Sequence, residues 1–399
     1  MRPHPQPSSS KQGTGKIDSI LLIGFGGPTP GCCQRFNPCL SEGQTAPEAY
    51  CFVSEILAQR MREQKPILDS DRGKEATLSA EVPVRPDQAR INEVVTHYIA
   101  LGGFSPFNDL TFEQASALEN EVGLPVYVGM RNWNPFVAQT LSQMIDNGHR
   151  QVLGIILSPF QSFVSWEEYQ QNVTDALDQL AMGESSQSWN FPRSGSKGNP
   201  HVADVSAHTT CSRFDRGFNL DAIMEVEYLS PWWAEDGFAQ AVVEEVRQSC
   251  LDWDRDRFQS AHLIFTAHGI PVSAASRSPY TRQFSQAATI IAEKLGKDFQ
   301  ISYQSTPDNS PIPWTEPEIT TVIHSLNADV SSDVIVVPIG FICDHVEVLY
   351  DLDQEARTVA EAKGLQMVRV PTVGSSPTFI QMLSRQIRAF VSTLQLNAN

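Results

Sequence analysis

Three acidic residues near the C-terminus repeat at a spacing that could present them together to a cation. Glu347, Asp351 and Glu355 are four residues apart. On an α-helix each such step turns about 400°, so the three side chains share one face. Like charges at this spacing destabilise a helix by a few tenths of a kcal/mol per pair. A line of hard oxygen ligands for a divalent cation would explain that cost.

The alternative is an ordinary solvated acidic face. The chain carries 46 Asp and Glu against 29 Lys and Arg, so acidic residues at this spacing also arise by chance. Asp344 and His345 lie just before the helix and add two further ligands or partners of ligands.

A histidine occupies a second position suited to chemistry. His268 follows the apolar run Leu263–Ala267, at the C-terminal end of a predicted strand. Ligands bind at that edge in open α/β sheets, and imidazole can exchange a proton near neutral pH. The alternative is a loop histidine held by backbone groups.

The first apolar run ends in a glycine-rich turn. Gly24, Gly26 and Gly27 do not form a G-x-G-x-x-G motif, and no Gly-Lys-Ser/Thr follows, so a phosphate-binding loop is excluded. We expect these glycines to let the backbone approach a flat ligand closely.

The elements that must position these residues follow an alternating pattern. Near-continuous apolar runs, typical of parallel strands buried on both faces, are separated by stretches long enough for crossover helices. The predicted strands are Ser19–Phe25, Pro125–Met130, Val152–Leu157, Ile223–Tyr228, His262–Thr266, Gln300–Tyr303, Val334–Pro338 and Gln366–Val370. The predicted helices include Phe112–Val122, Phe136–Asn147, Trp166–Ala181, Phe238–Cys250 and Tyr280–Leu295.

This alternation predicts an α/β fold with two similar Rossmann-like domains and an active-site cleft between them. We expect a disordered tail over residues 1–16, an N-terminal domain over 17–175 and a C-terminal domain over 176–399. Residues 183–220 are predicted to be a surface loop, and Gln64–Pro86 a loop insertion.

Composition narrows the class of protein. The 399 residues are 41% hydrophobic and 19% charged, as in a globular protein. The net charge of −17 argues against nucleic acid as a partner. No apolar run reaches the roughly 20 residues of a spanning helix. The N-terminus lacks the apolar segment of a signal peptide. We therefore expect a cytoplasmic protein, with a monomer favoured.

Seven segments together resemble the ferrochelatase family, whose members insert ferrous iron into a porphyrin. They are LLIGFGGP (21–28), LGGFSPFN (101–108), VYVGMRNWNP (126–135), LSPFQSFVSWEEY (157–169), LIFTAHGIP (263–271), YQSTPDNSPIPWTEPEI (303–319) and VPIGFICDHVEVLYDLD (337–353). They follow the family's order over roughly residues 17–390. The GGFSP and SFVSWEEY segments look closer to the bacterial branch that uses coproporphyrin III than to the mitochondrial branch.

The resemblance implies roles for particular residues. His268 corresponds to the histidine that faces the porphyrin centre, and Glu347 to its acidic partner across the macrocycle. Asp351 and Glu355 correspond to an acidic line leading outward on a π-bulged helix, so that His268, Glu347, Asp351 and Glu355 would handle the metal. A neutral histidine can accept a pyrrole proton while carboxylates hold Fe²⁺. Porphyrin and ferrous iron are the implied substrates, and no cofactor is required.

The resemblance also implies a set of porphyrin-binding residues, namely Phe25, Arg131, Asn132 and Trp314. Two of these depart from the family pattern. Phe25 replaces a tyrosine that is usual in the coproporphyrin branch, and Asn132 stands where some bacterial members have histidine.

A cysteine-rich segment is the third departure. Cys32, Cys33, Cys39 and Cys51 could hold a [2Fe–2S] cluster or zinc, although neighbouring Cys32 and Cys33 diverge and suit a single cluster poorly. The alternative is four unligated thiols in a loop. Cys343, in an apolar strand end, is predicted to be a core residue.

Two other functions remain open at this stage. A chelatase for Co²⁺ or Ni²⁺ and another tetrapyrrole would usually place two histidines at the metal, so the His268–Glu347 pair favours iron. A non-catalytic porphyrin- or haem-binding relative would explain Phe25 and Asn132.

Overall fold

Two parallel sheets form the framework of this computed structural model. It describes residues 16–31, 43–70, 87–182, 224–307 and 310–397, without the side chains of 60–70. The strands are β1 (Ser19–Gly24), β2 (Val126–Met130), β3 (Gln151–Ile156), β4 (Glu225–Tyr228), β5 (His262–His268), β6 (Gln300–Gln304), β7 (Asp333–Val337) and β8 (Gln366–Arg369). Their orders are β2-β1-β3-β4 and β6-β5-β7-β8, with every pairing parallel. All eight predicted strands are confirmed, with ends shifted by one or two residues.

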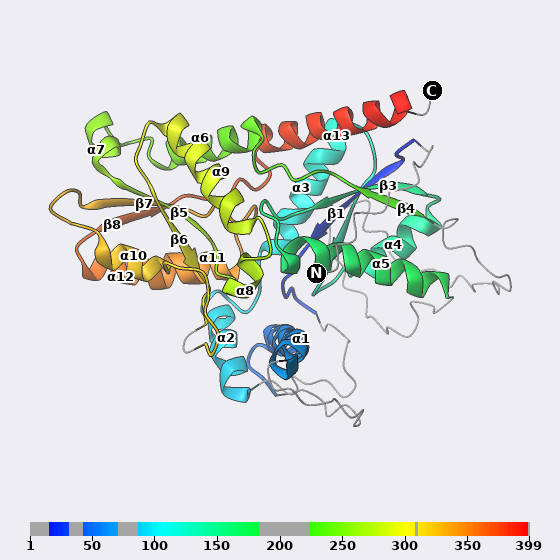
Figure 1. Cartoon of the computed structure of the whole chain (residues 1–399), viewed down its shortest axis with the longest axis horizontal. Coiled ribbons are helices and arrows are strands. Elements are labelled where there is room, and N and C mark those ends of the chain that lie inside the picture. The colour runs from blue at the N-terminus through cyan, green and yellow to red at the C-terminus, as the bar shows by residue number, and fades with distance from the viewer. Residues whose placement is uncertain (1–15, 32–42, 71–86, 183–223, 308–309, 398–399) are drawn as a thin grey trace.

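Helices cover both faces of each sheet (Figure 1). They are α1 (Pro47–Ser70), α2 (Gln88–Ala100), α3 (Phe107–Val122), α4 (Val137–Asp146), α5 (Glu168–Ala181), α6 (Asp236–Ser249), α7 (Arg255–Ser260), α8 (Val272–Ala275), α9 (Tyr280–Leu295), α10 (Ile319–Ser325), α11 (Val346–Tyr350), α12 (Arg357–Ala362) and α13 (Pro377–Asn397). Two π-helices, η1 (Phe163–Glu167) and η4 (Asp351–Ala356), precede α5 and α12. The five predicted helices are confirmed.

Three long helices were not predicted from the sequence: α1, α2 and α13. The loop prediction for Gln64–Pro86 is wrong over Gln64–Ser70, which continues α1; residues 71–86 lie outside the described part. The apolar residues of α1 and α2 do not join a sheet. They pack against each other in a separate cluster that includes Phe52, Val95 and Tyr98. In Figure 1 these two helices project below the junction of the sheets.

Alternate strand residues divide the core into layers. In β1, Ile20 and Leu22 enter one cluster, whereas Leu21 and Ile23 enter another on the opposite face. The first cluster also contains Phe265 of β5, so one continuous core lies against both sheets. The two α/β units therefore share a hydrophobic layer.

The last helix and β4 both extend the N-terminal unit. Helix α13 packs along α3 and α6, and runs along the top of the molecule in Figure 1. Strand β4, which the sequence prediction assigned to the C-terminal unit, pairs with β3 in the first sheet instead. That placement was wrong because β4 is short and half-exposed, so its sequence does not reveal its partner. The domain limits stay predictions. The predicted loop 183–220 and residues 1–15 of the predicted tail lie outside the described residues.

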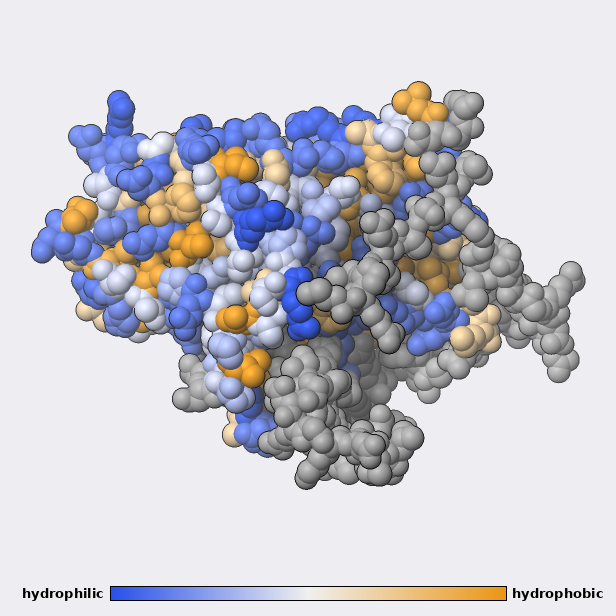
Figure 2. Space-filling model, viewed as in Figure 1, coloured by the Kyte–Doolittle hydropathy of each residue, from blue (hydrophilic) through white to orange (hydrophobic). Residues whose placement is uncertain are grey.

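The outer surface is mixed in polarity. On the face shown in Figure 2, hydrophilic residues dominate and apolar ones form scattered groups. Within the described residues, no helix combines the length and the apolar character needed to cross a membrane.

Candidate active site

One cavity of about 1260 Å³ collects the C-terminal ends of strands from both sheets. Its walls include Phe25 after β1, Arg131 after β2, His268 at the end of β5 and Ser305 after β6. Helices α1, α2 and α11 supply other parts of the lining. The predicted site residues that line it are Phe25, Arg131, Asn132, His268, Trp314, Glu347, Asp351 and Glu355.

The imidazole of His268 has one nitrogen engaged and the other directed at an acid. Its Nδ1 lies against the carbonyl oxygen of Gly269 at hydrogen-bond distance. A carbonyl only accepts, so neutral His268 carries its proton on Nδ1 and keeps a lone pair on Nε2. Nε2 lies 3.5 Å from Oε1 of Glu347. A proton accepted at Nε2 would therefore be stabilised by a neighbouring carboxylate.

This distance corrects one expectation from the sequence. Glu347 was expected across the macrocycle from His268. Non-bonded contacts of about 3.5–4.0 Å on each face require roughly 7 Å between groups on opposite sides of a flat ring. At 3.5 Å the two side chains leave no room for a ring between them, so the structure places Glu347 beside His268.

Asp351 is the most deeply placed acid of the line. It is 7% exposed, and burial, reinforced by the charges of Glu347 and Glu355, raises its pKa well above the usual value of a carboxyl group. The hydroxyl of Ser305 donates to Asp351 and opposes this rise. Ser305 adopts a left-handed backbone conformation with φ of 62°, which costs energy in a non-glycine residue.

A π-helix carries the outer acids. Asp351 begins η4, and Glu355 lies within it on the exposed side. The prediction of a π-bulged helix is confirmed. Because a π-turn contains more than four residues, it brings residues four apart closer to alignment than an α-turn does. No preformed group of three or more metal-ligating side chains occurs among the described residues.

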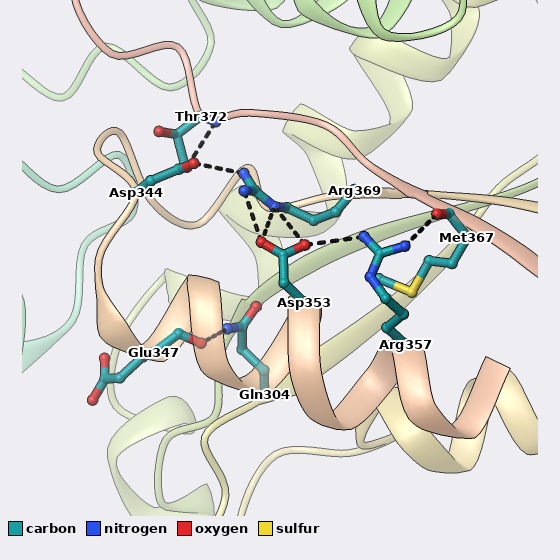
Figure 3. A network of polar contacts seen from close by, with 8 residues as sticks. All are labelled: Gln304, Asp344, Glu347, Asp353, Arg357, Met367, Arg369 and Thr372. Atoms are coloured by element: carbon teal, nitrogen blue, oxygen red, sulfur yellow. Dashed lines mark hydrogen bonds and ion pairs between the residues drawn. The ribbon is translucent and has the colours of Figure 1, made fainter. Parts of the chain in front are cut away.

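The opposite face of the acidic helix is anchored by arginines. Asp353 pairs with Arg369 at 2.8 Å and with Arg357 at 3.3 Å. Arg369 also binds Asp344 at 2.6 Å. Figure 3 shows Glu347 pointing away from this network, while its carbonyl accepts a hydrogen bond from Gln304. Asp344 is thus a structural partner of Arg369.

The sequence of the chain is similar to that of known proteins. The sequence profile of the family described as Ferrochelatase matches residues 81–192 and 198–390. A coproporphyrin III ferrochelatase of Streptomyces coelicolor is 32% identical over 311 residues, 73% of each chain. The chain belongs to the ferrochelatase family. It is an enzyme of the class that inserts metal into porphyrins.

Other relatives extend this match. A protein of Rhodopirellula baltica named ferrochelatase is 28% identical and covers 92% of this chain and 84% of its own length. Among solved structures, SirB from Bacillus subtilis with Fe³⁺ aligns over 95% of this chain and 97% of that one. The TM-score of this alignment is 0.48, at 8% sequence identity.

The wall after β1 and β2 contains the family segments with Phe25, Arg131 and Asn132. Asn132 is buried, and its side-chain amide and backbone N–H both donate to the carbonyl of Phe25, at 3.1 and 3.0 Å. Arg131 forms a buried ion pair with Glu168 at the start of α5. Asn132 therefore joins two strand ends, and Arg131 has its charge already compensated.

The glycine turn has a different cause from the one expected. A side chain on Gly27 would stand 2.5 Å from Cβ of Ser105, in the GGFSP segment. Gly26 has φ of +83°. These glycines allow the chain to approach Ser105 and to turn, although both also line the cavity.

Trp314 lines the cavity and forms an isolated antiparallel β-bridge with Pro271. Its indole N–H donates to the hydroxyl of Ser310 at 2.8 Å. The backbone of the segment after β5 and that of the Trp314 segment therefore support each other.

Sequence reasoning missed the part of the wall that comes from α2. His97 stacks on Tyr350 with ring centroids 3.8 Å apart and planes 9° apart, and burial lowers its pKa. His345 caps α11 by accepting from the Glu347 N–H at 3.1 Å, and burial lowers its pKa too. The spacing of His97 carries no signal, because its partner is distant in sequence.

Of the four cysteines in the proposed cluster, only Cys51 lies in the described residues. It is in α1, 3% exposed, within the apolar cluster of α1 and α2. The loop placement of Cys51 was therefore wrong. Cys32, Cys33 and Cys39 lie outside the described residues. Cys343 is buried in the core, as predicted.

Proposed function

We propose that this ferrochelatase-family chain inserts Fe²⁺ into coproporphyrin III, in the pathway to haem. The observation that carries the proposal is the His268–Glu347 pair, 3.5 Å apart in a cavity large enough for a tetrapyrrole. The substrate preference is supported by similarity to relatives named coproporphyrin III ferrochelatase, at 32% and 29% identity.

In the proposed mechanism, the macrocycle enters between the His268 face and the wall that carries Phe25 and Asn132. Nε2 of His268 accepts a pyrrole proton, and the adjacent Glu347 carboxylate stabilises the imidazolium. The phenyl ring of Phe25 offers an apolar surface to the macrocycle. Phe25 cannot ligate iron, so the acids on the other wall of the cavity would bind the metal.

The acids Glu347, Asp351 and Glu355 would bring Fe²⁺ to the ring. All three line the cavity, where Asp351 is buried and Glu355 is exposed. Hard divalent cations prefer carboxylate oxygens, and a cation must displace the proton that the raised pKa of Asp351 favours.

The decisive experiment is an anaerobic metal-insertion assay with coproporphyrin III and protoporphyrin IX, followed by loss of porphyrin fluorescence. We expect insertion of Fe²⁺ with a higher kcat/KM for coproporphyrin III. A higher value for protoporphyrin IX would reverse the substrate assignment. Binding of porphyrin without insertion of Fe²⁺ would instead indicate a porphyrin-binding relative, and faster insertion of Co²⁺ or Ni²⁺ a different chelatase.

The cysteine segment stays a separate proposal. Metal ligation needs thiolates, and Cys51 lies within the apolar cluster of α1 and α2. Elemental analysis of anaerobically prepared protein tests it. Iron with matching sulfide would establish a cluster, and one equivalent of zinc a structural site. If the protein contains neither iron nor zinc and the quadruple Cys→Ser variant is fully active, the four cysteines are unligated thiols.

A further inference from the structure

The charges around the cavity are unbalanced for an acidic substrate. Seven carboxylate side chains are among its described lining residues, and the whole chain has a net charge of −17. Porphyrins of the biosynthetic type carry propionate groups at the rim, which are anionic at neutral pH. A cationic side chain at the edge of the cavity would complement the charge of such a ligand.

Two of the three arginines in the described lining are already compensated. Arg90 binds Glu93 at 2.6 Å, one turn away on α2. Arg131 is paired with Glu168, with only 9% and 11% of the two side chains exposed. Each of these two guanidinium groups therefore already has a carboxylate neighbour that offsets its charge.

Arg277 is different. It is exposed at the cavity wall and forms no ion pair with a described residue. Its Nε–H donates to the carbonyl of Ser273 at 2.9 Å, which orients the guanidinium and leaves its terminal N–H groups for a ligand. A planar guanidinium can bind a carboxylate through two parallel hydrogen bonds.

The backbone holds Arg277 at a fixed place relative to His268. The hydroxyl of Tyr280 donates to the His268 carbonyl at 2.9 Å, closing the segment that contains Arg277. Val272 N–H donates to Pro313 at 2.9 Å, which ties the same segment to the Trp314 strand contact. A macrocycle centred at His268 would therefore have its rim near the segment that carries Arg277.

We propose that Arg277 binds a propionate carboxylate of the porphyrin. This inference rests on the proposed function for the identity of the ligand. Arg277 acts in porphyrin binding and takes no part in proton transfer or metal transfer.

The experiment compares Arg277→Gln and Arg277→Lys with Arg282→Gln. Arg282 lies on α9, is also exposed and is not part of the cavity lining, so the control removes the same charge elsewhere. Dissociation constants are measured without metal, by fluorescence titration with coproporphyrin III and with its tetramethyl ester. Insertion of Zn²⁺ at saturating coproporphyrin III gives kcat.

We expect Arg277→Gln to raise the Kd for coproporphyrin III about three- to tenfold, as for a partly exposed charged hydrogen bond. Arg277→Lys should recover part of this loss. The ester should bind equally to wild type and variant, and kcat should stay within about twofold. An unchanged Kd, an equal loss for the ester, or an equal loss in Arg282→Gln would overturn the proposal.

The outcome separates this inference from the proposed function. Weaker binding of the acid by Arg277→Gln in a protein that inserts no metal would support the anchor and refute the chelatase. Normal insertion with an unchanged Kd in the variant would refute the anchor alone.

Discussion

At the scale of single residues, the site depends on which nitrogen or oxygen each neighbour leaves available. The Gly269 carbonyl engages Nδ1 of His268, so Nε2 is the basic atom, and it faces Glu347. The hydroxyl of Ser305 donates to the Asp351 carboxyl group. The side-chain amide of Gln304 donates to the backbone carbonyl of Glu347. These contacts fix the orientation of the groups before any substrate arrives.

Replacing His268 by alanine removes this base. We expect metal insertion to fall by about 10²- to 10⁴-fold while porphyrin still binds, because general-base contributions have that size. Stopped-flow insertion rates and porphyrin titrations of the same preparation provide the measurement. Activity within threefold of wild type would remove His268 from the catalytic role.

Neutralising the acids should have graded effects. Glu347→Gln should be the most severe, because Glu347 lies next to His268. Asp351 and Glu355 lie further along the helix, so Asp351→Asn and Glu355→Gln should mainly raise the KM for Fe²⁺. Steady-state kinetics at varied Fe²⁺ separate the two effects. If Glu355→Gln were the most damaging, the direction of the acidic line would be wrong.

Asp351 should make stability depend on pH. Its folded pKa is raised, so its ionisation destabilises the fold above that pKa, and the penalty disappears below the unfolded value near 3.8. In chelator, Asp351→Asn should therefore melt at a higher temperature than wild type near pH 8 and at a similar one near pH 4. A variant that is less stable than wild type near pH 8 would contradict this assignment.

At the scale of elements, the helix formed by α11 and η4 has one face bound by arginines and the other face lining the cavity. Asp353 on η4 binds Arg369 of β8 and Arg357 of α12 (Figure 3). Glu347 and Asp351 line the cavity.

Arg369→Gln tests this anchoring. The side chains of Arg369, Asp344 and Asp353 are only 11–24% exposed, so the variant leaves two partly buried carboxylates without their shared cation. We expect the free energy of unfolding to fall by about 2–4 kcal/mol, as when a largely buried pair is broken.

Urea denaturation measures the change, with Arg357→Gln as the control. Arg357 is 36% exposed and its pair with Asp353 is longer, at 3.3 Å, so its loss should cost about 1 kcal/mol or less. Equal destabilisation by the two variants would show that Arg369 has no special part in holding the helix.

At the scale of the whole molecule, the shared core keeps two sheets together while their strand ends meet at one cavity. The lobe of α1 and α2 completes the wall, through Phe52, which packs edge-to-face on Phe25 and Trp133, and through His97. A ligand in the cavity therefore touches both units and the lobe at once.

Porphyrin alone should accordingly stabilise the entire fold. At a free concentration one hundred times its Kd, it should add about 2.7 kcal/mol to the free energy of unfolding. Thermal melting of metal-free protein with and without coproporphyrin III measures this as one transition that shifts upward. A split melt, in which only part of the signal shifts, would indicate that the two units unfold independently.

The sequence by itself determined the strands, five of the helices and a set of candidate residues that line the cavity. Buried parallel strands are continuous apolar runs, and the site residues follow strand ends, so local pattern and family segments were sufficient for His268, Arg131 and Glu347. The π-helix followed from the family resemblance.

Only the tertiary structure decided which groups meet. It placed Glu347 beside His268, assigned β4 to the first sheet and brought His97 onto Tyr350. It also showed that Arg90 and Arg131 already have carboxylate partners, whereas Arg277 has none among the described residues. These facts depend on contacts between residues far apart in the chain or on which side chain a packed neighbour leaves exposed. Neither periodicity nor spacing encodes such contacts, because many partners satisfy the same local pattern.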